Sequence, residues 1–426
     1  MGALFNLRAA FMFAACTLNL AAANAYANEH MEDSLSRFLI RGIPSMSSQP
    51  ESDRDNPNKL TTMARRVVLS NSKLASENQA RCLDGTMPVA YVAEGDPSRV
   101  IVFHQGGGWC SSTSECCQRA TTPLGSSSED KPTADLSTGG GYFNRDAEAN
   151  PFFHNFTMIY LRYCDGGSFS GMKKEPQQGV CGSDGVDKLF YQGGGILDAA
   201  IDTLAPHVSK AELLVVSGCS AGGLATYLHV DKWAEHFPQA RTVGMPDSGF
   251  FLDTDQGLRE QFGTTHGHYE TQLRWVFDAM EARGGVDQKC IAAHSGEEWR
   301  CMFAAYSAEH LVTSVFALQS VYDSWQVGNE LAGDVTPESV NQYGSILRAS
   351  VHKSLLSAPS GVAHGAFLDT CFHHCGKWNS MEVDGVDQTG AFASWLTSPG
   401  SRRVWEQTEA YPCDACCNRK ETTSID

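Results

Sequence analysis

The organisation of this chain follows from Leu213-Leu214-Val215-Val216-Ser217-Gly218-Cys219-Ser220-Ala221-Gly222-Gly223. Its apolar first half indicates a buried parallel strand, and a helix-like stretch continues to about His236. Gly218-x-Ser220-x-Gly222 has the spacing of a nucleophile elbow, in which a strand turns sharply into a helix. Small residues are needed two positions on either side of the serine because the backbone there is strained. We therefore expect Ser220 to be a nucleophile and the Ala221 N–H to face a developing oxyanion.

A glycine-rich turn, Gly106-Gly107-Gly108-Trp109-Cys110, follows an earlier strand expected at residues 99–104. In α/β-hydrolases the second oxyanion N–H comes from a loop after an early strand, and glycines let its backbone approach the substrate. A simple glycine-rich turn or a phosphate-binding loop is the alternative. The phosphate loop is disfavoured because the chain has no G-x-x-x-x-G-K-[ST]. We expect Gly107, Gly108 and Trp109 to contribute to an oxyanion hole.

A serine nucleophile also needs a base within hydrogen-bond reach and an acid that orients the base. In α/β-hydrolases the chain order is serine, acid, histidine, and the last two follow later strands. Asp323 follows an expected strand at 313–320, and the pair His373-His374 follows one at 365–368. The order Ser220, Asp323, His374 therefore fits a triad. Asp247 and Asp253 compete as the acid, and spacing alone leaves His373 and His374 nearly equal as the base.

The remaining pattern alternates strands and helices, which is typical of a mostly parallel sheet flanked by helices. Further strands are expected at 88–93, 157–163 and 241–245, and helices at 193–207, 222–236 and 338–354. Apolar spacing is irregular between residues 253 and 310, which indicates an inserted cap or lid. We expect a signal peptide at 1–27, a polar leader at 28–75 and one catalytic domain at 76–426.

The first residues have the layout of a secretory signal peptide. Arg8 precedes an apolar run from Ala9 to about Ala23, and small residues follow at Ala23-Asn24-Ala25 and Ala25-Tyr26-Ala27. An uncleaved anchor is disfavoured because the apolar stretch is short, and no internal run of 18 apolar residues indicates a membrane span. We expect a secreted protein that is not membrane-bound after cleavage.

Cysteine usage agrees with export. Of the fifteen cysteines, Cys16 lies in the expected signal peptide, and the others favour disulfides in an oxidising compartment. Plausible bridges are Cys110 with Cys116 or Cys117, Cys290 with Cys301, and Cys371 or Cys375 with the cluster Cys413, Cys416 and Cys417. Cys219 is expected to be a small buried thiol, which would leave one further cysteine unpaired. Zinc bound by the C-terminal cluster near His373 and His374 is disfavoured, since there is no second C-x-x-C.

The net charge of −17 argues against a nucleic-acid partner, because no basic stripe is present to neutralise phosphates. The same charge is mildly unfavourable for a heavily anionic substrate and leaves room for a neutral acetylated glycan such as xylan. Asn155-Phe156-Thr157 is a glycosylation sequon if the protein is exported through a eukaryotic secretory route.

Several blocks of sequence belong together: Cys82-Leu83-Asp84-Gly85, Gly106–Cys110, Arg162-Tyr163-Cys164-Asp165-Gly166, Ser217–Leu224, Tyr322-Asp323-Ser324-Trp325-Gln326 and Cys371-Phe372-x-His374-Cys375. In this order, from about Arg81 to Cys417, they closely resemble the pectin acetylesterase family, which also contains the animal Notum carboxylesterases. The residues in these blocks are more similar to those of the plant-type pectin acetylesterases than to those of Notum.

The resemblance implies a secreted α/β-hydrolase with a Ser-Asp-His triad and no metal or other cofactor. It assigns the acid to Asp323 and, from the flanking cysteines, the histidine to His374 rather than His373. It also implies an oxyanion hole built from the backbone of Gly107, Gly108, Trp109 and Ala221. Plant-type members usually carry a different residue at the position of Gln105 and a small residue at the position of His373, so this chain departs from the pattern at both.

The sequence therefore predicts a secreted serine esterase that removes acetyl groups from a cell-wall polysaccharide, with pectin favoured as its substrate partner. A Notum-like lipid deacylase is a rival within the same chemistry, and it would need a deep apolar pocket. A catalytically silent binding or structural protein is a rival of another class. A cysteine hydrolase using Cys219 is disfavoured, because the elbow directs Ser220 at the substrate.

Overall fold

The computed structural model describes residues 60–70, 80–139, 141–182, 185–254, 268–331, 335–358, 361–398, 400, 402–413 and 415–417. They belong to one compact unit that runs from Leu60 to Asp426. The expected signal peptide and most of the expected leader lie outside the described residues. Within those ranges, no helix combines the length and apolarity that crossing a membrane requires.

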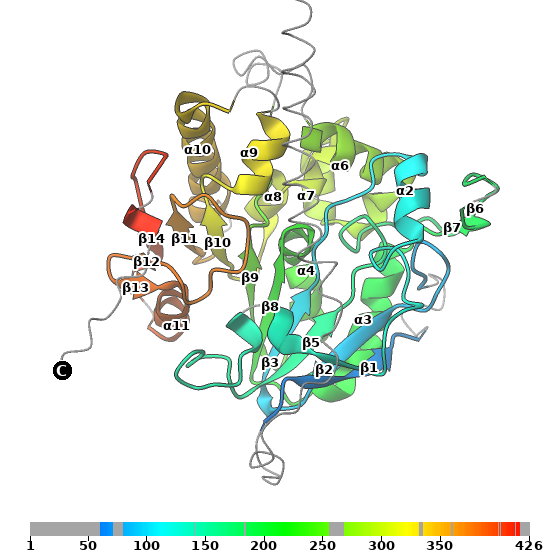
Figure 1. Ribbon diagram of the computed structural model, residues 1–426, viewed down its shortest axis with the longest axis horizontal. Coiled ribbons are helices and arrows are strands. Elements are labelled where there is room, and N and C mark those ends of the chain that lie inside the picture. The colour runs from blue at the N-terminus through cyan, green and yellow to red at the C-terminus, as the bar shows by residue number, and fades with distance from the viewer. Residues whose placement is uncertain are drawn as a thin grey trace, which may run out of the picture. The chain divides into compact units, whose positions relative to one another are not determined.

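Ten strands of the described chain form one sheet in the order β14-β11-β10-β9-β8-β3-β5-β2-β1-β4 (Figure 1). The strands are β1 (Met63–Val68), β2 (Val89–Ala93), β3 (Asp96–His104), β4 (Thr133–Asp135), β5 (Phe156–Leu161), β8 (Leu213–Cys219), β9 (Arg241–Asp247), β10 (Phe316–Ser320), β11 (Gly365–Asp369) and β14 (Val404–Glu406). Pairing is parallel from β5 through β3, β8, β9, β10 and β11 to β14, and antiparallel among β5, β2, β1 and β4. Two small sheets pair β6 (Gln177–Gln178) with β7 (Lys188–Leu189) and β12 (Glu382–Val383) with β13 (Val386–Asp387).

Helices separate the parallel strands along the chain. The α-helices are α2 (Thr113–Ala120), α3 (Gly193–Val208), α4 (Ala221–His236), α6 (His268–Ala279), α7 (Gln288–Ala293), α8 (Ala304–Ser307), α9 (Ser324–Glu330), α10 (Pro337–Val351) and α11 (Gln388–Thr397). Shorter turns are η3 (Leu136–Gly139), η4 (Gly141–Phe143), η5 (Ala282–Gly285), η6 (Glu298–Met302), η7 (Ala308–His310), the π-type η8 (His352–Leu356) and η9 (Ala415–Cys417).

Both faces of the parallel sheet are buried. Alternate side chains of β3 enter different apolar clusters: Val100 and Val102 join the cluster that contains α3 and α4, whereas Ile101 and Phe103 join the cluster that contains α11. Side chains of a strand alternate between faces, so a strand covered on both sides reads as a continuous apolar run. The parallel strands therefore lie close to where the sequence predicts them. The helices α3, α4 and α10 also lie close to their predicted positions.

Elements with weaker patterns were missed. β1 lies within the segment assigned to the polar leader, yet it pairs with β2 and β4, so the sheet begins before residue 76. Only Ala64 of this strand is fully covered, and Arg65 and Arg66 are exposed, so its apolar signal is weak. α2, α11 and β14 lie in stretches for which no helix or strand is predicted from the sequence.

The described part of the predicted cap is helical and contains α6, α7 and α8. These helices lie beside α9 at one end of the sheet (Figure 1), and α6 contacts α9 directly. The first residues of the cap region after Thr254 lie outside the described residues. Because the parallel strands share one direction, the loops after β3, β8, β9, β10 and β11 all emerge at the same edge of the sheet.

Seven disulfides join all fourteen cysteines of the described residues: Cys82–Cys164, Cys110–Cys116, Cys117–Cys181, Cys219–Cys375, Cys290–Cys301, Cys371–Cys417 and Cys413–Cys416. Three of these agree with the pairs expected from sequence proximity. The expectation that Cys219 is a free buried thiol is wrong, because it bonds to Cys375 from the histidine loop. The accompanying expectation of a second unpaired cysteine is wrong for the same reason.

Candidate active site

Ser220 occupies a sharp turn between β8 and α4. Its backbone has φ +61° and ψ −125°, a conformation that residues other than glycine rarely adopt. Ser220 is only 7% exposed. A side chain at Gly218 would overlap the carbonyl of Gly222, and one at Gly222 would overlap the carbonyl of His104. The elbow thus needs glycine at both positions, as the sequence pattern predicts. The Ser220 N–H donates to the Asp247 carbonyl at 2.9 Å, which anchors the strained residue to β9.

Asp323 and His374 lie in direct contact. The His374 Nδ1 atom lies 2.8 Å from Asp323 Oδ1 and 2.9 Å from Oδ2, and Asp323 is fully buried. Asp323 also begins α9, where its carboxylate accepts the N–H groups of Trp325 and Gln326 at 3.0 and 3.1 Å. Nε2 of His374 is buried and has no hydrogen-bond partner among the described residues. The imidazole is therefore oriented from one side and unengaged on the other.

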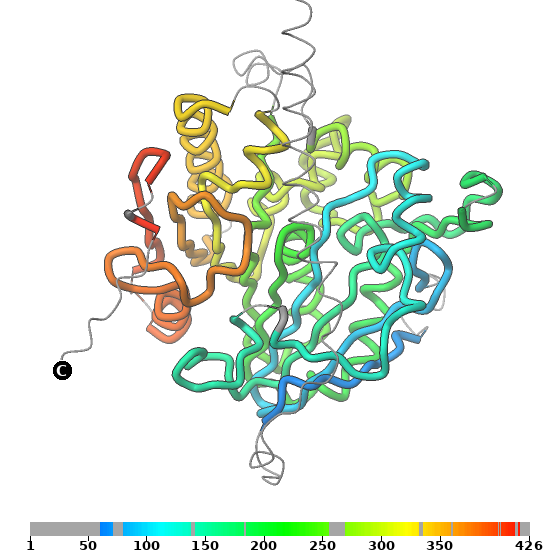
Figure 2. Tube along the Cα trace, viewed as in Figure 1, coloured from blue at the N-terminus to red at the C-terminus, as the bar shows by residue number. Residues whose placement is uncertain are grey.

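The loop that carries His374 is joined covalently to the elbow. Cys219 immediately precedes Ser220 and Cys375 immediately follows His374, and the two cysteines form a disulfide with Cα atoms 5.8 Å apart. A second disulfide, Cys371–Cys417, holds the start of the same loop to the C-terminal segment. In Figure 2 the orange segment after β11 returns beside the yellow α9, as the contact between His374 and Asp323 requires. Residues far apart in sequence are thus fixed at one edge of the sheet.

Asp247, a competing acid in the sequence, has a different position. Its carboxylate accepts from the Tyr142 hydroxyl, from the Gly376 N–H at 2.9 Å and from the Ser248 hydroxyl at 3.1 Å. Burial raises the pKa of this carboxyl, although these hydrogen bonds oppose the shift. Asp247 therefore holds the elbow through its carbonyl and the histidine loop through its carboxylate. The other competitor, Asp253, accepts from Tyr306 at 2.7 Å and lies 3.7 Å from Arg300 in the cap region.

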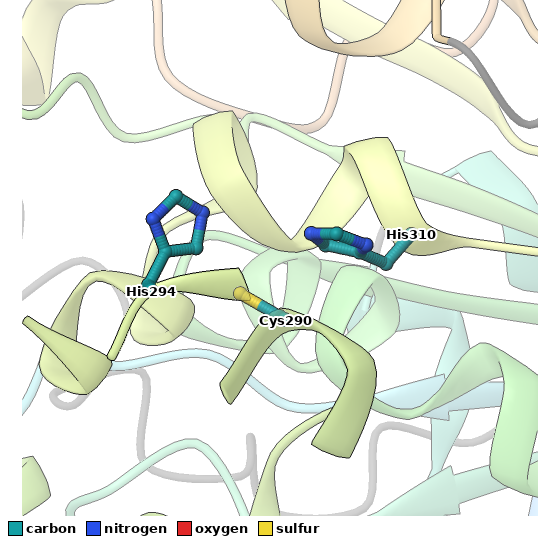
Figure 3. Close-up of side chains that lie close together, drawn as sticks. All are labelled: Cys290, His294 and His310. Carbon is teal, nitrogen blue, oxygen red and sulfur yellow. The ribbon is translucent and has the colours of Figure 1, made fainter. Parts of the chain in front are cut away.

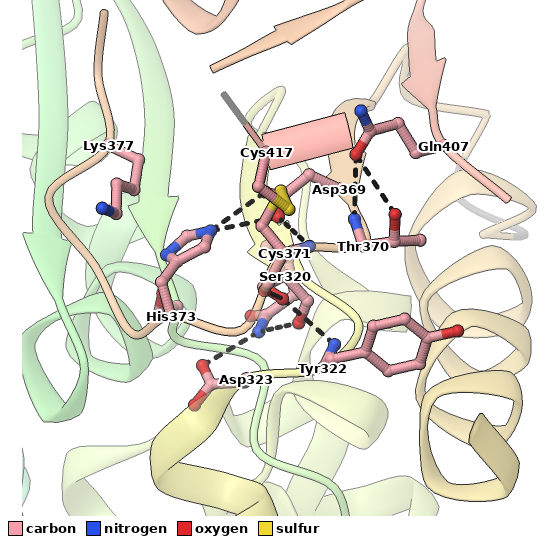
Figure 4. Close-up of polar contacts among 12 residues, drawn as sticks. Ser320, Tyr322, Asp323, Asp369, Thr370, Cys371, His373, Lys377, Gln407 and Cys417 are labelled. Carbon is pink, nitrogen blue, oxygen red and sulfur yellow. Dashed lines mark hydrogen bonds and ion pairs between the residues drawn. A yellow bond between two sulfur atoms is a disulfide. The ribbon is translucent and has the colours of Figure 1, made fainter. Parts of the chain in front are cut away.

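His373 contacts a different carboxylate, that of Asp369. Its Nε2 lies 3.0 and 3.3 Å from the two oxygens of Asp369, the last residue of β11 (Figure 4). Burial lowers the pKa of His373, but the charge and hydrogen bond of Asp369 outweigh it and the net pKa is raised. The structure thus separates the neighbouring histidines: His374 contacts Asp323, whereas His373 contacts the buried carboxylate of Asp369.

The glycine loop after β3 is held from one side by Arg119 of α2 and by Tyr163. Arg119 Nη2 donates to the Gly107 carbonyl at 2.8 Å, and the Tyr163 hydroxyl donates to the Gly108 carbonyl at 2.8 Å. In a planar trans peptide the C=O and N–H groups point in opposite directions. The Gly108 and Trp109 N–H groups are therefore directed away from Arg119 and Tyr163. Neither N–H donates to any other described residue, and Gly107 and Gly108 have positive φ angles of 138° and 64°.

This loop also meets the elbow. A Cβ atom built on Gly106 would lie 3.0 Å from Cβ of Ser220. The Trp109 indole donates to the Ser168 hydroxyl at 2.7 Å, and that hydroxyl donates to the Ala221 carbonyl at 2.8 Å. Ser168 thus links Trp109 with the first residue of α4. The geometry offers three backbone N–H groups, from Gly108, Trp109 and Ala221, near the nucleophile.

Gln105, at the start of the same loop, forms side-chain hydrogen bonds with the residues that follow β5. Its side-chain oxygen accepts from Arg162 at 2.6 Å and from the Tyr163 N–H at 3.0 Å.

Arg119 was missed by sequence analysis, because its role depends on carbonyls that only folding brings together. Tyr163 lies in one of the sequence blocks quoted for the family resemblance, so that block held a signal for it. Asp165, from the same block, is fully buried, and this burial raises its pKa to about 6.

Two clusters of cysteine and histidine have the proximity of metal ligands. One contains Cys290, His294 and His310 (Figure 3), and the other contains Cys371, Cys416 and Cys417. Every cysteine in both clusters is in a disulfide, so no thiolate is free to bind a metal in this state. The C-terminal cluster considered for zinc is therefore used for covalent cross-links, and His373 and His374 are engaged by carboxylates.

The chain is similar to known proteins over most of its length. Residues 62–418 match the family described as Pectinacetylesterase. The chain belongs to the pectin acetylesterase family. Pectin acetylesterase 5 of Arabidopsis thaliana is 31% identical over 412 residues, which cover 90% of this chain and 87% of that protein. The palmitoleoyl-protein carboxylesterase NOTUM of Drosophila melanogaster is 26% identical over 356 residues, which cover 80% of this chain and 49% of that protein.

The fold of this pectin acetylesterase family member is also found in a solved structure of the Wnt deacylase Notum from Drosophila. The TM-score is 0.67 at 23% identity, and the match covers 84% of this chain and 99% of that chain. The predicted α/β-hydrolase-like fold is confirmed. Its relatives include both pectin acetylesterases and protein carboxylesterases, so the protein is a carboxylic ester hydrolase, as predicted.

Proposed function

We propose that this protein is a secreted serine esterase that removes acetyl groups from a cell-wall polysaccharide, with pectin as the first candidate. Ser220 is the nucleophile, His374 the general base and Asp323 the acid that orients it. The observation that carries the proposal is the contact of His374 Nδ1 with both Asp323 oxygens, while Nε2 has no partner among the described residues. A disulfide between the residues adjacent to Ser220 and His374 supports their assignment to one site.

In the first half-reaction, the Ser220 oxygen bonds to the acetyl carbonyl carbon while His374 Nε2 takes the hydroxyl proton. The carbonyl π electrons move onto oxygen and form a tetrahedral oxyanion. When this intermediate collapses, the ester C–O bond breaks, and His374 returns its proton to the departing sugar oxygen. The products are a free sugar hydroxyl and an acetyl ester on Ser220.

In the second half-reaction, water attacks the acetyl-enzyme and His374 takes a proton from it. When the second tetrahedral intermediate collapses, the bond to the Ser220 oxygen breaks and that oxygen takes the proton from His374. The product is acetic acid, which loses its proton to solvent and leaves as acetate. Asp323 is fully buried and stabilises the imidazolium formed in each half-reaction. The N–H groups of Gly108, Trp109 and Ala221 bind both oxyanions, with the Gly107 backbone setting the turn of the loop.

The substrate assignment rests on relatives. Four Arabidopsis proteins named as pectin acetylesterases are 29–31% identical to this chain. The charge of −17 makes a strongly anionic polymer less favourable than a heavily esterified one or a neutral acetylated glycan. A second candidate is removal of a fatty acyl group from a protein, as the name of the palmitoleoyl-protein carboxylesterases describes. The Notum structure shares the fold and supports keeping this candidate.

The deciding experiment measures acetate released from acetylated pectin and from acetylated xylan by the mature protein, with Ser220→Ala as the blank. Release that disappears in the variant supports the serine mechanism, and the polymer that gives the faster release identifies the substrate class. Hydrolysis of octanoyl esters without acetate release from either polymer would instead support the deacylase. Failure of a fluorophosphonate to label the unaltered protein at Ser220 would contradict the nucleophile assignment.

A further inference from the structure

Trp325 lies against both halves of the proposed site. Its indole is stacked on the His374 ring, with ring centroids 6.0 Å apart and an angle of 28° between the planes. The indole Cζ2 atom lies 3.9 Å from the position that a Cβ atom on Gly108 would occupy. One side chain therefore stacks on the imidazole that receives the proton and lies close to the glycine whose N–H is proposed to bind the oxyanion.

The gap between Trp325 and Gly108 is too narrow for an acyl chain. A Cα–Cβ bond adds about 1.5 Å, so Cζ2 lies no more than about 5.4 Å from the Gly108 Cα atom. A methylene inserted between two carbon atoms needs about 3.5–4.0 Å to each of them, or about 7–8 Å in total. An alkyl chain cannot pass between the indole and the oxyanion loop, so Trp325 closes this side of the site.

Other walls around the same point are aromatic and more deeply buried. Phe251 lies 4.8 Å from Trp109 and 6.4 Å from His374 between ring centroids, and Tyr269 of α6 lies 5.1 Å from Phe251. Phe251 and Tyr269 are fully buried, whereas Trp325 is half-buried. Truncating Trp325 would therefore open a space lined by apolar rings, where additional methylene groups could be buried.

The position of Trp325 is set by the proposed catalytic acid. The backbone N–H of Trp325 donates to Asp323 Oδ1 at 3.0 Å, and its backbone carbonyl accepts from the Asn329 side-chain amide at 2.7 Å. The carboxylate that orients His374 thus also fixes the first turn of α9, which carries the indole. The backbone that carries the indole and the imidazole of His374 therefore share one anchor, the Asp323 carboxylate.

From this geometry we infer that Trp325 is the residue that restricts the enzyme to short acyl groups, such as acetyl, and excludes fatty acyl chains. The inference rests on the proposed function, since it concerns the acyl group held at the same serine. It makes acyl-chain selectivity a property of one side chain of the acid loop. The proposed preference for an acetylated glycan over a fatty-acylated protein would then have a local steric cause.

The test compares kcat/KM for p-nitrophenyl acetate, butyrate and octanoate in the unaltered protein and in Trp325→Ala. The unaltered protein should prefer acetate. The variant should raise the octanoate-to-acetate ratio by about tenfold or more, because each methylene that gains apolar contact is worth roughly a factor of four. Trp275→Ala is the matched control, since Trp275 is a partly buried cap tryptophan in contact with Tyr191 rather than His374. Its ratio should stay unchanged.

Loss of activity by the same factor on all three esters would overturn the inference, because it would mean that Trp325 only supports His374. A change in preference between p-nitrophenyl acetate and naphthyl acetate, without a change in acyl preference, would also overturn it. If Trp325→Ala does not fold, Trp325→Leu should give a smaller rise in the same ratio. Absence of hydrolysis and of fluorophosphonate labelling in the unaltered protein would instead contradict the proposed function itself.

Discussion

Cys219 and Cys375 form a disulfide that spans 156 residues of sequence and joins the residue before Ser220 to the residue after His374. A bond at this place limits how far the two loops can separate. The hydrogen bonds from Gly376 and Ser220 to Asp247 hold the same loops without covalent linkage. One covalent link and one shared aspartate thus help to hold the proposed nucleophile and base in position.

Removing this disulfide should lower kcat more than it raises KM. In the Cys219→Ala/Cys375→Ala variant the histidine loop loses its covalent link to the elbow, and a displacement of about 1 Å at a reacting group can cost about a hundredfold in rate. We expect kcat to fall at least about tenfold, measured on p-nitrophenyl acetate under conditions where the variant is folded.

The Cys290→Ala/Cys301→Ala variant is the matched control, because it removes a buried disulfide from the cap region. It should lose stability with kcat within about twofold of the unaltered protein. Equal kcat values for the two double variants would mean that the Cys219–Cys375 bond does not position the site.

The sequence predicts the centre of this fold better than its edges, for a physical reason. β3, β8 and β10 are covered on both faces and give continuous apolar runs, whereas most positions of β1 are exposed and the edge strand β14 has only three residues, of which one is buried. The closeness of Asp323 and His374 could be anticipated because strand ends in a parallel sheet meet at one edge. The disulfide between Cys219 and Cys375 could not, since cysteine spacing carries no information on connectivity.

Arg119 is a residue of the candidate site that could not be predicted from the sequence. Its half-buried guanidinium donates to the carbonyls of Gly107, Gly108 and Leu124, which belong to loops that meet only in the folded chain. No motif in the sequence marks it. His373 illustrates the opposite case: the sequence offered two adjacent histidines, and the Asp369 contact distinguishes them.

Replacing Asp323 should abolish most of the activity while leaving the fold intact. Asp323→Asn keeps the size of the side chain but cannot stabilise the imidazolium, and the corresponding change in a Ser-His-Asp protease costs about 10⁴ in kcat. We expect a loss of about three to four orders of magnitude on p-nitrophenyl acetate. Asp253→Asn, which alters the rejected acid in the cap region, should stay within about threefold of the unaltered protein. The reverse order of effects would move the acid assignment to Asp253.

Replacing Arg119 should weaken the oxyanion hole. Without its bond to the Gly107 carbonyl, the peptide that presents the Gly108 N–H is free to rotate, and loss of one oxyanion donor costs about 10²–10³ in kcat. We expect Arg119→Ala to reach this range. Arg119→Lys retains one donor and should lose less. Tyr163→Phe removes the bond to the Gly108 carbonyl and should act in the same direction.

A trifluoromethyl ketone separates an oxyanion effect from a general loss of structure, because it forms a stable oxyanion with the nucleophile. Across these variants its Ki should rise by the same factor by which kcat/KM falls. The melting temperature should show no such correlation. Variants that lose activity with an unchanged Ki would contradict a role of Arg119 in the oxyanion hole.

The buried pair of His373 and Asp369 should make stability depend on pH. Burial lowers the pKa of His373, but Asp369, with help from Asp247 and Asp323, raises it above the ordinary value of 6.5. A histidine whose pKa is raised by folding stabilises the native state fully below its unfolded pKa, and this contribution is lost as pH rises through the folded pKa. The stability advantage over His373→Gln should therefore be larger at pH 5.5 than at pH 9, as measured by urea unfolding.

Activity separates this structural role from catalysis. His373→Gln should keep kcat within about tenfold of the unaltered protein, whereas His374→Gln should lose about three orders of magnitude or more, because only His374 contacts Asp323. Asp369→Asn should reproduce the pH-dependent loss of stability seen in His373→Gln, since it removes the other half of the pair. If His373→Gln were the inactive variant and His374→Gln the active one, the base would have to be reassigned, and the Asp369 pair would become the catalytic dyad.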